Sequence, residues 1–177
     1  MTLRELDRVL TCAVHNEAGK RRWLDALAIF VARDVPFVLV GVPLVLLLIP
    51  SGWGEAGIYT LSVLFSQLLV IAIQAGIHRK RPFQREHLHP LFHLRVATTS
   101  IPSGHASLCA AVLFSLWVFF GGGLYVLVGA LVSAAVLLAR VYAGLHYWSD
   151  ILAGLLLGGI VAYSVFSLLV PYLPVPL

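Results

Sequence analysis

Five long apolar segments are the feature that most restricts what this chain can fold into. A helix needs roughly 20 mostly apolar residues to cross the hydrocarbon layer of a membrane. Hydrophobic residues make up 60% of the chain and charged residues only 11%, a balance unlike that of soluble domains. The sequence therefore predicts an all-α integral membrane bundle of about five transmembrane spans, at residues 24–49, 56–77, 106–120, 124–142 and 151–170.

The first 22 residues predict a helix that lies in the membrane interface rather than crossing it. Apolar side chains recur at helical spacing from Leu3 to Val14 with charged residues between them, and the basic segment GKRRW follows. We expect one domain over residues 1–177, made of the interfacial helix with its flank (1–22) and the transmembrane bundle (24–170).

Two residue types inside the spans carry structural predictions. Pro36 and Pro43 lie in the first apolar segment and are expected to kink it, because proline removes a helical N–H donor. Gly154, Gly158 and Gly159 lie in the last segment, where small residues allow helices to approach closely.

The polar residues of the chain gather in two interruptions, residues 78–105 and 140–150. With five spans, both interruptions fall at the same membrane face. The first ends in the sequence PSGH, where Pro102 and Gly104 predict a turn that leads into the third span. Ser103 supplies a hydroxyl there, and a helix N-terminus that follows such a turn favours anion binding.

Charged and titratable residues in these interruptions indicate phosphoryl chemistry. Arg81 and Arg140 have guanidinium groups suited to bidentate contact with phosphate oxygens. His146 and Asp150 are four residues apart, so on a helical turn the carboxylate accepts from one ring nitrogen and leaves the other free to attack. His105 is placed to protonate the leaving oxygen. We expect phosphoryl transfer to water without a required metal or other cofactor.

The order of these motifs resembles the type 2 phosphatidic acid phosphatase superfamily of membrane lipid phosphatases. The motifs are Arg-Pro at 81–82, Pro-Ser-Gly-His at 102–105, and Arg-x5-His-x3-Asp at 140–150. The resemblance implies His146 as the nucleophile that forms a phosphohistidine, Asp150 as its orienter and His105 as the proton donor. It implies these phosphate ligands: Arg81, Ser103, Gly104 and Arg140.

Two positions depart from the family pattern. Gln74 stands where the first motif usually begins with Lys, and Ala139 stands where the third motif usually has Ser. The missing lysine removes one positive charge from the phosphate site. Arg79 and Lys80 are therefore additional candidates for phosphate binding.

Within the superfamily, the small size, the segment RPF with histidines after it, and the missing lysine resemble the bacitracin-resistance type of undecaprenyl diphosphate phosphatase. This resemblance implies removal of the terminal phosphate of a polyprenyl diphosphate, which recycles the carrier lipid of peptidoglycan synthesis. Phosphatidylglycerophosphate, phosphatidate and lipid A phosphate stay open as substrates. A non-enzymatic anion transporter or binding protein is the alternative of another class.

Several residues have simpler structural interpretations. His87, His89 and His93 are spaced irregularly and are expected in a solvated loop rather than a metal site. Arg33 and Asp34 are expected to neutralise each other inside the first span. Tyr147 and Trp148 are expected to anchor the chain at the membrane interface.

The expected location is the bacterial cell (inner) membrane, which the chain crosses several times. With five spans, all 12 Lys and Arg residues fall at the face that carries the motifs. Counting charges alone places that face in the cytoplasm, whereas the resemblance implies an active site that faces outward. We expect an active site that faces outward, because Arg81 and Arg140 are expected to bind phosphate and therefore do not count as evidence for orientation. The expected partners are membrane lipids and a lipid phosphate substrate, and no nucleic acid.

Overall fold

The computed structural model describes residues 1–49, 53–92 and 99–173, and in these residues it contains helices and no strand. In chain order the elements are α1 (Leu3–His15), α2 (Arg22–Arg33), α3 (Val35–Leu48), α4 (Trp53–Gly76), α5 (Pro82–Arg85), α6 (Gly104–Phe120), α7 (Leu124–Tyr142), α8 (Trp148–Leu169) and the 3₁₀ helix η1 (Val170–Tyr172). The predicted all-α class is confirmed for the described residues.

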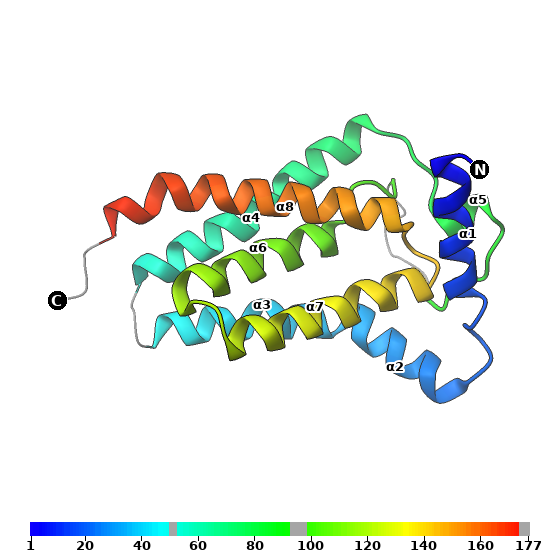
Figure 1. Ribbon diagram of the computed structural model, residues 1–177, viewed down its shortest axis with the longest axis horizontal. Helices are drawn as coiled ribbons and strands as arrows, with labels where there is room; N and C mark the ends of the chain where they lie inside the picture. Colours follow the sequence, from blue (N-terminus) through cyan, green and yellow to red (C-terminus); the bar gives the residue numbers. More distant parts are fainter. Residues whose placement is uncertain (50–52, 93–98, 174–177) are drawn as a thin grey trace.

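The long helices run side by side along the longest axis of the molecule, and α1 crosses one end of them (Figure 1). The central helix is α6, which packs against α3, α4, α7 and α8. Most of its buried side chains are small, including Ala106, Cys109 and Ala111. Small side chains let the surrounding helices approach closely.

Among the described residues, three helices are long and apolar enough to cross a membrane: Trp53–Gly76, Leu124–Tyr142 and Trp148–Tyr172. The pair α2 and α3 adds a fourth crossing if the two helices form one bent span. The remaining apolar helix, α6, has 17 residues, which corresponds to about 25 Å at the helical rise. The helices match the five predicted segments in position.

The first span is bent next to Pro36, where a kink was predicted. The axes of α2 and α3 differ by 43°, with Asp34 between them and Pro36 at the start of α3. Pro43 lies inside α3, which continues as a helix to Leu48, and the expected kink at Pro43 stays a prediction. Arg33 and Asp34 pair with each other as predicted, with Nε 3.1 Å from Oδ1.

The predicted close approach of the last span is confirmed at two of its three glycines. A methyl group at Gly154 would overlap the carbonyl oxygen of Ser103, and one at Gly158 would overlap the backbone of Ser107. Gly159 faces open space, because a methyl group there would meet no described neighbour within 4 Å, so the prediction is wrong at this position. The two close contacts fix α8 against the first turns of α6.

Candidate active site

Four chain segments meet at the end of the bundle that α1 covers. The segment after α4, the N-terminus of α6, the C-terminus of α7 and the first turn of α8 all lie there (Figure 1). Hydrogen bonds join them: Ser100 N–H donates to Arg79 O at 2.9 Å, and Ser103 N–H donates to Asp150 O at 3.0 Å. The two polar interruptions predicted to share one face therefore form one structure.

The hydrogen bonds of His146 identify its tautomer. The side chain is 2% exposed. Nδ1 lies 3.0 Å from the carbonyl oxygen of Ser100, which can only accept, so Nδ1 carries the proton. Nε2 lies 3.2 Å from Nη1 of Arg81, which can only donate, so Nε2 presents its lone pair. Both contacts require the same neutral form of the ring.

Burial is the main cause that lowers the pKa of His146 to about 4, and the positive charges of Arg140 and Arg81 act in the same direction. Asp150 opposes them. The imidazole is therefore neutral at pH 7. A neutral ring with an unprotonated Nε2 has the form that a nucleophilic histidine requires.

Asp150 differs in detail from its predicted arrangement. Its Oδ2 lies 3.7 Å from Nδ1 of His146, whereas the carbonyl oxygen of Ser100 lies 3.0 Å from the same nitrogen. The predicted helical turn shared by the two residues is absent, because α8 begins at Trp148, after His146. Oδ2 instead accepts from the N–H of Tyr147 at 2.8 Å and caps α8.

Arg81 is buried and held by backbone carbonyls. Nη1 donates to Leu145 O at 3.0 Å, and Nη2 donates to Thr99 O at 3.3 Å. Burial lowers the pKa of Arg81, and Asp150 opposes this shift. Carbonyl groups fix the guanidinium in place without neutralising its charge.

Arg140 is also buried, and its Nη1 donates to Ala32 O at 3.2 Å. Pro36 explains why this carbonyl accepts from a side chain: proline has no N–H to make the helical bond to the residue four positions earlier. Within the described residues, Nε of Arg140 is buried with no hydrogen-bond partner. The charges of Arg81 and Arg140 repel each other. An anion bound near both guanidinium groups would offset this repulsion.

The segment PSGH forms the start of α6, as predicted. Ser103 is the N-cap residue, and its Oγ accepts from Ala106 N–H at 3.4 Å. His105 lies in the first turn, where the positive charges of Arg140 and Arg81 act on its ring and His146 lies close enough to interact with it. The two predicted imidazoles and the two predicted guanidinium groups therefore share one electrostatic environment.

Two glutamine side chains hold the PSGH turn from α4. Nε2 of Gln74 donates to Pro102 O at 2.8 Å, and Nε2 of Gln67 donates to Gly104 O at 3.2 Å. Gln74, which stands at the usual lysine position, thus supports the backbone of the turn.

Arg79, an additional candidate for phosphate binding, pairs with two carboxylates, and its role as a phosphate ligand stays a prediction. Nη1 donates to Asp150 Oδ1 at 2.8 Å, and Nη2 donates to Asp7 Oδ2 at 2.9 Å. Two carboxylates already neutralise this guanidinium, so it has little charge left to attract an anion. Lys80, the other candidate, is exposed.

Sequence reasoning missed several residues of this region. Ser100 and Thr99 act through carbonyl groups, which every residue has, so no sequence signal identifies them. Asp7 carries no signal either, because charged residues are ordinary on an amphipathic helix. Tyr147 is 2% exposed and lies under Arg79, with 4.5 Å from Cζ to the ring centroid, so its interpretation as an interfacial anchor is wrong.

The predicted histidine-rich loop is partly described. His87 and His89 are exposed, and His93 lies outside the described residues. In the described part of the chain, no three His, Cys, Asp or Glu side chains gather in a way that could hold a metal ion.

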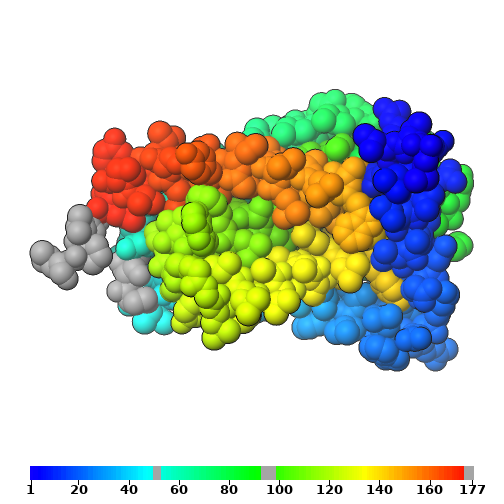
Figure 2. Space-filling model, in the orientation of Figure 1, coloured from blue at the N-terminus to red at the C-terminus, as the bar shows by residue number. Residues whose placement is uncertain are grey.

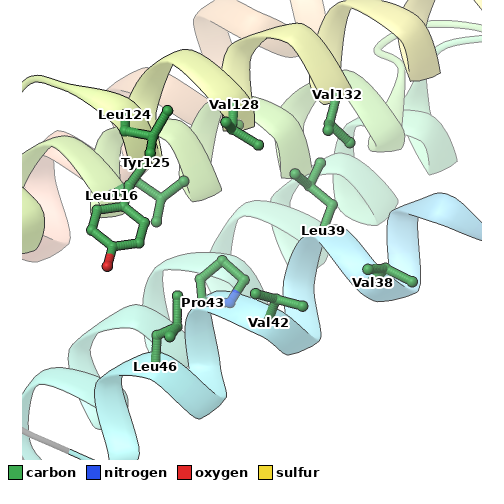
Figure 3. Close-up of a pocket in the computed structure, with 11 residues that line it drawn as sticks. Val38, Leu39, Val42, Pro43, Leu46, Leu116, Leu124, Tyr125, Val128 and Val132 are labelled. Carbon is green, nitrogen blue, oxygen red and sulfur yellow. The ribbon is translucent and has the colours of Figure 1, made fainter.

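Two apolar grooves lie away from these polar residues. One, of about 400 Å³, runs between α3 and α7 and is lined by residues such as Leu39, Pro43 and Val132 (Figure 3). The other, of about 750 Å³, lies between α4 and α8. Of the described residues that line the two grooves, none is charged, so neither groove forms the candidate active site.

Comparisons with known proteins agree on the family. The model of the PAP2 superfamily matches residues 55–172. A protein of Escherichia coli (strain K12) named "Putative undecaprenyl-diphosphatase YbjG" is 28% identical over 164 residues, which cover 88% of this chain and 79% of the relative.

Two crystal structures share the fold. A PAP2 type phosphatidylglycerolphosphate phosphatase from Bacillus subtilis has a TM-score of 0.73 and 20% identity, covering 93% of this chain and 85% of that one. Aquifex aeolicus LpxE has a TM-score of 0.74 and 22% identity, covering 89% of this chain and 93% of that one.

Proposed function

The chain belongs to the PAP2 superfamily, and on this premise we propose that it is a membrane lipid phosphatase that converts undecaprenyl diphosphate to undecaprenyl phosphate and inorganic phosphate. The observation that carries the proposal is the neutral His146, whose Nε2 lies beside Arg81. A second buried cation, Arg140, has a guanidinium nitrogen that no described residue satisfies. The named Escherichia coli relative supports the choice of substrate.

In the first step, the terminal phosphate binds to Arg81, Arg140, the hydroxyl of Ser103 and the N–H of Gly104. The Nε2 lone pair of His146 attacks the terminal phosphorus and forms a phosphohistidine. The bond from phosphorus to the bridging oxygen breaks, and His105 donates a proton to that oxygen as the lipid phosphate leaves. Asp150 stabilises the positive charge that develops on His146.

In the second step, water restores the enzyme. His105, now unprotonated, accepts a proton from a water molecule as its oxygen attacks the phosphohistidine. The bond from phosphorus to Nε2 breaks, inorganic phosphate leaves, and both histidines return to their starting forms. The cycle needs no metal.

The test is phosphate release from a panel of purified lipids by the full chain, with EDTA present. Undecaprenyl diphosphate is expected to have the highest kcat/KM in a panel that also contains phosphatidylglycerophosphate, phosphatidate and lipid A phosphate. A clear preference for one of the other lipids would contradict the proposed substrate but not the proposed reaction, hydrolysis of a lipid phosphate.

Variants separate the enzyme from a transporter or binding protein. His146→Ala and His105→Ala are expected to lower kcat by about 1,000-fold or more, because each removes a group that acts on the reacting atoms. Hydrolysis that survives both changes would contradict the proposed mechanism. Retention of a ³²P label on wild-type protein after acid-free quenching, and its loss in His146→Ala, would support the phosphohistidine.

We further propose that five crossings place the site at the outer face of the bacterial cell membrane. The span count rests on α6, which is short for a span but lies at the centre of the bundle among longer helices. An outward site would process carrier lipid released by cell-wall synthesis, in accord with a role in peptidoglycan synthesis and bacitracin resistance.

A further inference from the structure

α1 faces the bundle with polar side chains and presents apolar side chains outward. Thr11 and His15 are buried, whereas Leu3, Val9 and Leu10 are exposed. The helix forms a layer across one end of the molecule (Figure 2). Val14, near the C-terminal end of α1, packs against the hydrophobic core, and polar contacts join the rest of this face to the bundle.

Asp7 makes the polar contacts at the centre of this face. Its Oδ1 accepts from the N–H of Ser149 at 3.0 Å, and its Oδ2 accepts from the hydroxyl of the same residue. Ser149 is in the first turn of α8, where N–H groups have no helical acceptor. A carboxylate at this position also interacts favourably with the helix dipole. Asp7 therefore stabilises the N-terminus of α8 from a different helix.

Asp7 is also joined to the site through Arg79. One nitrogen of Arg79 binds Asp7 at 2.9 Å, and the other binds the fully buried Asp150 at 2.8 Å. A guanidinium group is planar and rigid, so the position of one carboxylate constrains the position of the other. Asp150 in turn lies 3.7 Å from the ring of His146. A continuous chain of charged contacts thus runs from α1 to the proposed nucleophile.

We propose that Asp7 is a positioning residue for the reaction: it holds Arg79 and the first turn of α8 so that Asp150 and His146 keep their places. The inference rests on the proposed function. Asp7 touches no reacting atom and acts through Arg79 and Ser149. Removal of its charge leaves Arg79 anchored on one side only, and a displacement of about 1 Å at a nucleophile can cost on the order of 100-fold in rate.

The experiment is steady-state kinetics of the full-length protein in lipid nanodiscs, with the panel lipid that the wild type hydrolyses best. Asp7→Asn is expected to lower kcat about 10- to 100-fold and to leave KM within about twofold, because the lost interaction positions the nucleophile rather than the lipid. Asp7→Glu restores the carboxylate and is expected to recover part of the rate. Glu17→Gln is the matched control, since Glu17 is exposed and pairs with Lys20.

A second measurement distinguishes positioning from general destabilisation. Asp7→Asn and Arg79→Lys interrupt the same chain of contacts, so their effects on kcat are expected not to multiply in the double variant. Thermal unfolding of each variant shows whether the protein is folded at the assay temperature.

Folded Asp7→Asn with wild-type kcat, or with a change in KM alone, would overturn the inference. If Asp7→Asn does not fold, Ser149→Ala decides in its place: lower kcat at unchanged KM supports positioning, and wild-type kcat overturns it. A wild-type chain that hydrolyses no lipid of the panel would instead overturn the proposed function, and this inference with it.

Discussion

Backbone carbonyl groups hold the principal side chains of the candidate site. Arg81 binds the carbonyls of Leu145 and Thr99, and Arg140 binds that of Ala32. A carbonyl fixes a cation in direction but carries no net charge. The two arginines are therefore positioned and still positive, which suits the binding of a doubly charged phosphate group.

The protonation state of His146 follows from its burial and can be predicted. Burial holds the pKa of the ring at about 4, below the usual value of about 6.5. The neutral Nδ1–H tautomer is thus expected to persist from about pH 8 down to about pH 5. ¹⁵N-histidine NMR in detergent micelles measures this directly, with His146→Gln used to assign the signal. A ring that titrates near its usual pKa, or one with its proton on Nε2, would contradict the site geometry.

The lowered pKa of His146 also makes the folded protein less stable in acid. The folded pKa lies below the unfolded pKa, so the unfolded chain takes up the proton first as the pH falls. The stability contributed by the neutral buried ring is present above about pH 6.5 and is lost progressively toward about pH 4. The histidine therefore favours unfolding in acid, in addition to any loss of activity there.

Residue types were predictable from the sequence in this site, whereas their contacts were not. The arginines, histidines and PSGH turn stand in recognisable order, and the structure brings them to one end of the bundle. The hydrogen-bond acceptor of His146 Nδ1 is a carbonyl 46 residues away, and any residue could supply such a group. The contacts of Arg79 were equally unpredictable: its charge suggested phosphate, and the structure pairs it with two carboxylates.

The contact between the helices α6 and α8 depends on Gly154 and Gly158. Gly159, on the same helix, provides a control. Gly158→Ala forces a methyl group into the backbone of Ser107 and is expected to destabilise the fold by about 1–3 kcal/mol. Gly159→Ala is the matched control, because that position is open and alanine favours helix. Thermal unfolding in one detergent compares them. Equal melting temperatures for the two variants would mean that the close contact does not stabilise the bundle.

The break between α2 and α3 gives a prediction about function. Pro36→Ala supplies an N–H that competes with Arg140 for Ala32 O, so kcat/KM is expected to fall by about 10-fold as the guanidinium loses its anchor. Pro43→Ala, about two turns along α3, is the control and is expected to keep the wild-type value. A wild-type kcat/KM in Pro36→Ala would show that the broken helix does not position Arg140.

The elements themselves were largely predictable, because apolar length and helix-breaking residues are local properties of a sequence. Each predicted segment has a helix at its place, and α6 begins within two residues of the expected start. The position of the bend and the roles of the glycines were not predictable in full. Both depend on which face of a helix meets its neighbour, and periodicity is weak in a helix that is apolar all round.

Two arguments about the orientation of the molecule in the membrane disagree: the distribution of charges favours a site in the cytoplasm, whereas the proposed function favours a site that faces outward. The basic segment that joins α1 to α2 and contains Lys20 and Arg21 lies at the end of the bundle that carries the site (Figure 1). Positive flanks ordinarily stay in the cytoplasm. Arg79, Arg81 and Arg140 contact protein groups and are therefore poor indicators of orientation. The positive charges of the segment that joins α1 to α2 therefore remain as the argument against an outward site.

Labelling of single cysteines tests both the orientation and the number of crossings. In a background with Cys12→Ser and Cys109→Ala, Glu17→Cys reports on the site end, and Gly122→Cys reports on the turn between α6 and α7 at the other end. An outward site predicts that a membrane-impermeant maleimide labels only Glu17→Cys in intact spheroplasts, and Gly122→Cys only after lysis. The reverse pattern would turn the site to the cytoplasm. Labelling of both positions before lysis would contradict three crossings between them by the bent pair α2–α3, α4 and α6, since an odd number of crossings puts the two positions on opposite sides of the membrane.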